Sequence, residues 1–248
     1  MSPLQALDYG LDPDRVTHTD SPLAAARRRL GGRYPIDPFG FDPHLSDLLV
    51  PVVTAVVRVD VGGGEHVPAH GPATLVSNRG FGVAEPAAVT VAVRRATGRR
   101  LRVVGASPLP FLSGLTRRLG AVSTSPRDLA GVLRAGHLVA VPLAPTWLRT
   151  GAGTPPLPLM QAMTRAPVVP VAVTPGGPLG TAIRPWRVRF GEPVVPDPGD
   201  EPGDPLAAAR LAEAVRDAVA DLLGRDRRPS AGTIAGEARS GRGPDRRE

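Results

Sequence analysis

Short apolar runs alternate with amphipathic segments through the middle of the chain. Several runs are apolar on both faces, as buried parallel strands are. The strand-like runs are residues 56–61, 73–77, 101–105, 120–123, 137–143, 167–173 and 185–196. The helix-like segments between them are residues 85–98, 110–120 and 125–136. This alternation predicts an α/β fold with a mostly parallel sheet flanked by helices.

Further helices are predicted on both sides of this alternating region. Ser21 and Pro22 are typical of a helix start and Gly31 of a stop, so a short helix is expected between them. Residues 44–57 have helical spacing with a kink expected at Pro51, and an irregular arm at residues 33–43 precedes them. Residues 204–224 form an amphipathic pattern, with Asp204 as the expected cap and Gly224 as the expected end.

These patterns divide the chain into three parts. Residues 1–32 are expected to be a leader with a short helix, and residues 33–224 the α/β domain with its closing helix. Residues 225–248 are rich in Arg, Gly, Ser and Pro without an apolar pattern, so a disordered tail is predicted there.

Composition narrows the classes of function. There is no cysteine, which excludes disulfides, thiol catalysis and Cys-ligated metal sites. The formal charge is +7 and all 30 basic residues are Arg. The absence of Lys, with abundant Ala, Gly and Pro, indicates coding bias of an actinobacterial, high-GC kind. The alternative is attraction to an anionic membrane or nucleic acid, but the arginines are scattered and aromatics are only 4%, so no nucleic-acid partner is expected.

No targeting or spanning segment is predicted. The first residues are acidic and lack an apolar core. The longest apolar stretch, residues 48–57, is about half of the ~20 residues that a spanning helix needs. We expect a cytoplasmic protein that is soluble or in peripheral contact with the inner face of the plasma membrane.

Ligands of parallel α/β sheets bind at the carboxyl ends of strands, and three loops there are rich in Gly or Pro. They follow the strands at 73–77, 137–143 and 167–173. The first, in "LVSNRGFGVAEP" (residues 75–86), joins a strand to a helix and offers Asn78, Arg79 and Glu85. A guanidinium beside a helix N-terminus favours an anion, so Arg79 is a candidate phosphate or carboxylate ligand, with a mobile surface arginine as the alternative.

Four stretches together resemble the phospholipid and glycerol acyltransferases, the family of the bacterial 1-acylglycerol-3-phosphate acyltransferases. They are "RVDVGGGEHVPAHGPATLVSNR", "LTRRLGAVSTSPRDLAGVLRAGHLVAVPLAP", "APVVPVAV" and "VRFGEPVVP". The resemblance covers residues 33–196 and keeps the order and spacing of the family's strands. It implies an acyltransferase-like α/β fold and a role in acyl transfer to glycerolipids.

The resemblance also marks where reactive groups are expected. The family's His general base falls on Arg79 and its Asp on Ala84, while its Phe-Pro-Glu-Gly motif falls on residues 141–144. Asn78, Arg79, Leu143 and Ala144 then line the expected substrate site. A guanidinium stays protonated and cannot act as the base. Glu85 is the nearest carboxylate, and its other interpretation is a partner of the helix dipole.

Other residues offer little alternative chemistry. Of the five histidines, His66, His70 and His137 precede strands, on the edge opposite to the expected site, while His18 lies in the leader and His44 at a helix start. Trp147 and Arg149 could form a rim that contacts lipid. No metal-ligand spacing, nucleophile elbow or phosphate-binding loop is present, so neither a metal nor a bound cofactor is expected.

Two hypotheses remain open. In the first, the protein transfers an acyl group from acyl-CoA or an acyl carrier protein to a lysophospholipid or similar hydroxyl, with an unexpected group as base. In the second, it is a non-catalytic relative that binds lipid or an anionic ligand, or regulates an active paralogue.

Overall fold

Seven strands of the described residues form one sheet. The computed structural model describes residues 21–32, 36–78, 84–104, 113–122, 125–142, 166–176, 184–200 and 204–227. The strands are β1 (Val59–Gly62), β2 (Ala73–Ser77), β3 (Leu101–Val104), β4 (Ala121–Val122), β5 (Leu138–Pro142), β6 (Val168–Thr174) and β7 (Trp186–Phe190). Their order in the sheet is β1-β7-β6-β2-β5-β3-β4. The predicted α/β class is confirmed.

The sheet is parallel over five neighbouring strands. Five neighbouring strands run in the same direction, namely β4, β3, β5, β2 and β6. β7 pairs with β6 in the antiparallel sense, and β1 pairs with β7 in the parallel sense. β2 lies between β5 and β6 and is buried along its whole length. A strand flanked on both sides and covered on both faces is mostly apolar, as Ala73, Leu75 and Val76 are, and Thr74 is a buried polar residue within it.

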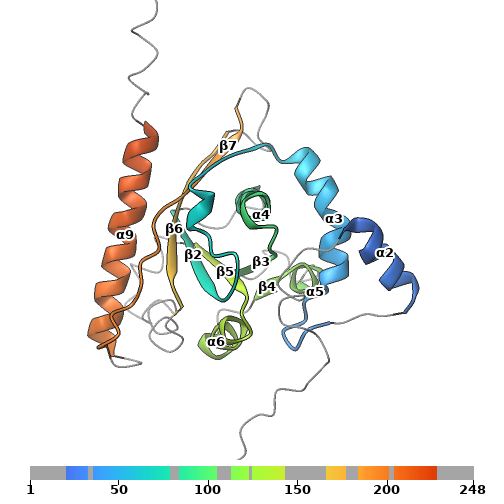
Figure 1. Cartoon of the computed structure of the whole chain (residues 1–248), viewed down its shortest axis with the longest axis horizontal. Helices are drawn as coiled ribbons and strands as arrows, with labels where there is room; N and C mark the ends of the chain where they lie inside the picture. Colours follow the sequence, from blue (N-terminus) through green and yellow to red (C-terminus); the bar gives the residue numbers. More distant parts are fainter. Residues whose placement is uncertain are drawn as a thin grey trace, which may run out of the picture.

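Helices cover both faces of the sheet (Figure 1). They are α2 (Pro22–Leu30), α3 (Pro43–Val56), α4 (Ala84–Thr97), α5 (Ser113–Arg118), α6 (Pro126–Arg134) and α9 (Pro205–Arg227), with the 3-10 turn η1 (Gly64–His66). α4 packs on one face, in a core that includes Leu75, Val89 and Val171. α6 and α9 pack on the other, in a core with Val76 and Leu129.

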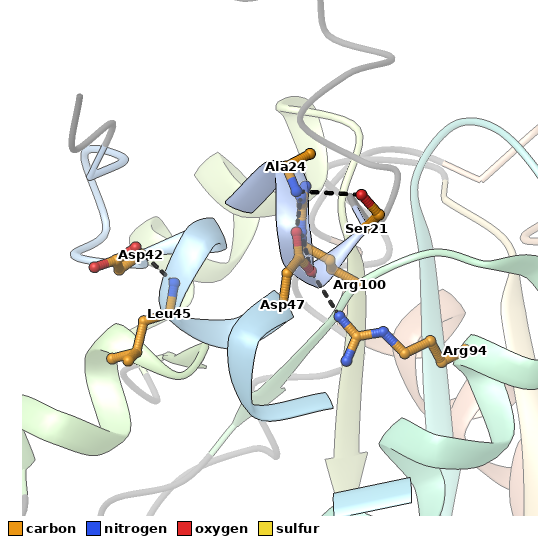
Figure 2. A network of polar contacts seen from close by, with 7 residues as sticks. All are labelled: Ser21, Ala24, Asp42, Leu45, Asp47, Arg94 and Arg100. Carbon is orange, nitrogen blue, oxygen red and sulfur yellow. Dashed lines mark hydrogen bonds and ion pairs between the residues drawn. The ribbon is translucent and has the colours of Figure 1, made fainter. Parts of the chain in front are cut away.

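The N-terminal segment is part of the folded unit. α2 lies against α3, and the predicted cap is present, because Ser21 Oγ accepts a hydrogen bond from the backbone N–H of Ala24 (Figures 1 and 2). Asp42 caps α3 through the N–H of Leu45 and pairs with Arg29 of α2 at 2.8 Å. The described part of the arm, from residue 36, is irregular and ordered by such contacts, as predicted.

A buried carboxylate joins α3 to the sheet. Asp47 is fully buried; its Oδ1 lies 2.7 Å from Arg94 Nη2 of α4, and its Oδ2 lies 2.6 Å from Arg100 Nη2 just before β3 (Figure 2). Burial lowers the pKa of Arg94 to about 10 although Asp47 opposes the shift, so the guanidinium is charged at neutral pH. Asp47 thereby joins α3 by charge to α4 and to the start of β3, about 50 residues further along the chain.

Three predicted boundaries are wrong. The strand predicted at residues 185–196 ends at Phe190, the last residue of β7. Residues 56–58 belong to α3 and its end rather than to a strand, and β1 begins only at Val59. α9 does not end at Gly224 but continues to Arg227. The last turn is held by tertiary contacts that the amphipathic pattern does not record. Asp226 accepts a hydrogen bond from Thr174 Oγ1 at 3.0 Å and lies within 4 Å of two arginines of β7. The remainder of the predicted tail lies outside the described residues.

Candidate functional site

The three loops expected to form the site start side by side. β2 is hydrogen-bonded to β5 and to β6, and all three run in the same direction. Ser77, at the end of β2, is in register with Pro142 of β5 and Val171 of β6. The three loops predicted to form the site, after residues 77, 142 and 174, therefore begin on neighbouring strands at the carboxyl edge of the sheet. Because the residues in register on either side are apolar, Ser77 is the polar residue of that row.

Asn78 extends the pairing of β2 with β6 through its side chain. Its Oδ1 accepts a hydrogen bond from the N–H of Val173 at 2.6 Å, and its Nδ2 donates to the carbonyl oxygen of Val173 at 3.2 Å. The carboxamide thus imitates one more peptide unit in the ladder. This contact attaches residue 78, the first after β2, to β6. The predicted role of Asn78 in substrate binding stays a prediction.

Glu85 is buried and bonded to the end of β2. Its residue is only 6% exposed, and Ser77, equally buried, donates from Oγ to Glu85 Oε1 at 2.9 Å. Glu85 lies in the first turn of α4, where the helix dipole favours a negative charge, as expected from the sequence. Sequence reasoning missed the partner. One pattern could have indicated the Ser77–Glu85 hydrogen bond. A hydroxyl residue ends a strand, and an acidic residue lies eight positions later in the first turn of a helix.

Of the other predicted site positions, one lies within the described residues and the rest do not. Ala84 is the first residue of α4, directly before Glu85. Arg79, Leu143 and Ala144 lie outside the described residues, as do Trp147, Arg149 and His18. Of the predicted site residues, the structure therefore places Asn78, Ala84 and Glu85 at this edge, and it adds Ser77, which the sequence analysis does not include.

A solved structure has a fold similar to that of this chain. No family model matches the chain. A crystal structure of the 1-acyl-sn-glycerophosphate (LPA) acyltransferase PlsC from Thermotoga maritima superimposes with a TM-score of 0.50 and 18% sequence identity, covering 75% of this chain and 83% of that one. The chain has an acyltransferase-like fold. The fold expected from the sequence resemblance is thus confirmed.

Two mycobacterial proteins are similar to this chain in sequence. An uncharacterized protein of Mycobacterium tuberculosis is 28% identical over 257 residues, which cover 80% of this chain and 71% of the relative. One of Mycobacterium leprae is 27% identical over 268 residues, covering 84% and 72%. Both matches cover most of this chain, and because both relatives are uncharacterized they indicate no activity.

The amino edge of this acyltransferase-like sheet holds a different polar group. Arg99 donates to the carbonyl oxygens of Pro68 and Gly136 at 2.8 Å each. Arg102, on β3, lies 2.9 Å from Asp37 of the N-terminal arm and 4.5 Å from the ring centre of Phe41. Phe39 of the same arm lies against Gly131 of α6, where an added Cβ would come within 2.9 Å of the ring. These arginines hold loops and the arm against the sheet.

The described histidines are distributed as the sequence predicts. His66 Nδ1 lies 3.1 Å from the carbonyl oxygen of Phe190, and His44 is buried in α3. His137 precedes β5 on the amino edge, and its burial, followed by the nearby charges of Arg102, Arg99 and Arg100, lowers its pKa to about 3. A neutral histidine on the amino edge is remote from the Ser77 end of β2. Among the described residues, His, Asp and Glu form no group of three suited to a metal ion.

The described helices include none that combines the length and apolar character needed to span a membrane.

Proposed function

We propose that this protein binds an acyl thioester together with a lysophospholipid, or a similar hydroxyl acceptor, and serves glycerophospholipid metabolism. The observation that carries the proposal is the fold match to an acyltransferase over three quarters of the chain. The four stretches of sequence resemblance support it, since they follow the same order of strands. Fold alone does not fix function, so the local chemistry of the carboxyl edge has to be tested directly.

Acyl transfer at this edge would form a bond between the acceptor oxygen and the acyl carbon and break the bond from that carbon to sulfur. The attacking hydroxyl must lose a proton, and the family's base and its partner are replaced by Arg79 and Ala84. This replacement favours a second candidate function, in which the protein binds the same ligands without transferring the acyl group. The chain thus supports binding more directly than turnover.

Binding and transfer are measured separately to test the proposal. Titration calorimetry with palmitoyl-CoA and with lysophosphatidic acid gives the two dissociation constants, and release of free CoA reports transfer. The variant Arg79→His/Ala84→Asp restores the family's dyad and serves as the comparison. We expect both ligands to bind in the micromolar range. Absence of binding by the natural sequence and by the dyad variant would contradict the proposal. Binding with CoA release only in the dyad variant would select the non-catalytic function.

A membrane surface is the proposed location of this binding. On α3, Leu49, Val52 and Val56 are spaced three and four residues apart, so they lie on one face, and all three are exposed, Val52 to 59%. Neighbouring α2 exposes Leu23 and Leu30. Apolar side chains on adjoining helices, close to basic ones, suit the interface of an anionic bilayer.

Basic residues accompany this apolar surface. α2 ends with Arg27, Arg28 and Arg29, and Arg58 is exposed directly after α3. We expect the protein to sediment with phosphatidylglycerol vesicles and less with phosphatidylcholine vesicles. Val52→Asp should weaken that binding several-fold, whereas Val195→Asp, at an equally exposed site away from α3, should leave it unchanged. Equal vesicle binding by the two variants would argue against α3 as the contact.

A further inference from the structure

We propose that the Ser77 hydroxyl and the Glu85 carboxylate form a proton relay for acyl transfer. The inference rests on the proposed function, because it assumes that an acyl thioester and a hydroxyl acceptor bind at the carboxyl edge. It goes further in assigning the proton acceptor that the sequence resemblance leaves vacant. Ser77 is the catalytic residue of the pair, and Glu85 acts through it.

The geometry of the pair suits a relay. Ser77 Oγ lies 2.9 Å from Glu85 Oε1 and donates its hydrogen to it. A hydroxyl that donates in one direction retains two lone pairs for accepting hydrogen bonds from another. Ser77 can therefore receive a proton from an acceptor hydroxyl while its own proton moves to the carboxylate. This step uses only the Oγ–Oε1 contact that the structure contains.

Two features of the surroundings act on the Glu85 carboxylate, a helix N-terminus and the exclusion of water. Glu85 lies in the first turn of α4, where the helix N-terminus stabilises its negative charge. Both residues are 6% exposed, and the residues of the neighbouring strands in register with Ser77 are the apolar Pro142 and Val171. Electrostatic interactions and hydrogen bonds are stronger in such a poorly hydrated setting than in water. A carboxylate kept this dry and bonded to a hydroxyl is the arrangement that activates an oxygen nucleophile.

The proton balance of the reaction closes without another reagent. The acceptor oxygen attacks the thioester carbon and gives its proton to Ser77 Oγ, while the Ser77 proton moves to Glu85. When the carbon–sulfur bond breaks, the thiolate leaves with the electron pair. It regains a proton from Glu85 through Ser77, so the products are the ester and the free thiol. Both side chains return to their starting states.

The test is a steady-state assay of the full chain with palmitoyl-CoA and lysophosphatidic acid. CoA release is followed from pH 4 to pH 9, and palmitoyl-CoA binding is measured on every variant to establish that it is folded. The variants are Glu85→Gln, Ser77→Ala and the conservative Ser77→Thr. Glu213→Gln, on the exposed side of α9, is the matched control. Intact-mass analysis detects any acyl group left on the protein.

The relay predicts a specific set of changes. Glu85→Gln and Ser77→Ala should each lower kcat about 100-fold with palmitoyl-CoA binding unchanged, in the range that general base catalysis supplies. Ser77→Thr should retain activity within about tenfold, since its hydroxyl can still relay. The rise of kcat with pH in the natural protein should disappear from the residual activity of Glu85→Gln. Glu213→Gln should match the natural protein.

Three results would overturn the relay while leaving the proposed function intact. They are palmitoyl-CoA binding without CoA release by the natural protein, release that survives Glu85→Gln, and a palmitoyl adduct on Ser77. The adduct would make Ser77 a nucleophile instead. Failure of the natural protein to bind either ligand would be a different outcome, because it would remove the proposed function and the relay with it.

Discussion

The two edges of the sheet use polar residues in opposite ways. At the amino edge, Asp47 holds Arg94 and Arg100, and Arg99 holds two backbone carbonyls. These charges are buried, and their partners come from segments far apart in the sequence. At the carboxyl edge, Ser77, Asn78 and Glu85 bond within β2, β6 and the start of α4. Thr174, at the end of β6, bonds Asp226 of α9.

The difference separates structural charge from candidate chemistry. A guanidinium fixed by a carboxylate or by two carbonyls stabilises one arrangement of the chain and has little capacity to respond to a ligand. The Ser77 hydroxyl donates to one carboxylate, and its oxygen can still accept a hydrogen bond from a ligand. It lies at the edge where α/β folds bind ligands. The number of buried charges is therefore a poor guide to the site in this protein, because most of them are on the other edge.

Removal of Asp47 should have the largest effect on stability. Asp47→Ala leaves Arg94 and Arg100 buried beside a missing partner, and breaking a buried ion pair costs about 3–5 kcal/mol. Urea denaturation followed by circular dichroism measures the loss. Asp60→Ala is the control, since Asp60 pairs with Arg189 at a half-exposed site where such pairs contribute about 0–1 kcal/mol. Similar losses for the two variants would remove the contrast between buried and exposed charge.

His137 should make stability at the amino edge depend on pH. The unfolded imidazole takes up a proton below about pH 6.5, whereas the folded one stays neutral down to about pH 3. In that window the unfolded state binds more protons, so the free energy of unfolding falls as pH is lowered, by up to about 1.4 kcal/mol per unit.

A glutamine at this position cannot titrate. Between pH 6.5 and pH 4.5, His137→Gln should therefore lose roughly 2–3 kcal/mol less than the natural protein does. Urea titrations at several pH values measure the two slopes. Parallel slopes for the two proteins would show that His137 is not shielded from protonation in the folded state.

Asn78→Ala should have an intermediate effect, located at the carboxyl edge. The substitution removes both hydrogen bonds to the backbone of Val173, which is itself buried, and unsatisfied buried groups cost about 1–3 kcal/mol. Hydrogen exchange at the Val173 amide measures the local change. Asn78→Asp is the informative comparison, because it keeps the acceptor for the N–H of Val173 but loses the donor. An unchanged exchange rate in Asn78→Ala would contradict the role of Asn78 in the ladder.

Glu85→Gln should have the smallest effect on stability, about 1 kcal/mol or less. The amide oxygen can still accept the Ser77 hydrogen bond, so the main loss is the interaction of a negative charge with the N-terminus of α4. Thermal unfolding measures the change. A loss as large as that of Asp47→Ala would place Glu85 among the structural charges and end the contrast between the edges.

Much of the fold was predictable because its strands are short and continuously apolar. The predicted strand 73–77 coincides with β2, and the predicted helix at 125–136 contains α6. The location of the candidate site followed from the same patterns, since the carboxyl ends of parallel strands meet at one edge. Glu85 was recognised as a nearby carboxylate on the same grounds.

The remaining features depend on contacts between distant segments. Asp47 and Arg100 are 53 residues apart, and nothing in the local pattern of either indicates the other. The end of α9 was misplaced because Gly224 favours a helix stop, whereas Asp226 bonds Thr174 and keeps the last turn helical. The Ser77–Glu85 bond was missed because the resemblance directs attention to Arg79 and Ala84, which lie between them.

The hydrogen bonds of Ser77 and Asn78 have a consequence for how this protein could change. They secure the chain on both sides of residues 79–83, at β6 before the segment and at α4 after it. The strand that precedes this segment and the helix that follows it each have an anchor that does not involve residues 79–83. A segment from an active acyltransferase grafted between Asn78 and Ala84 should therefore leave both anchors in place, and thermal unfolding of the graft measures whether they suffice.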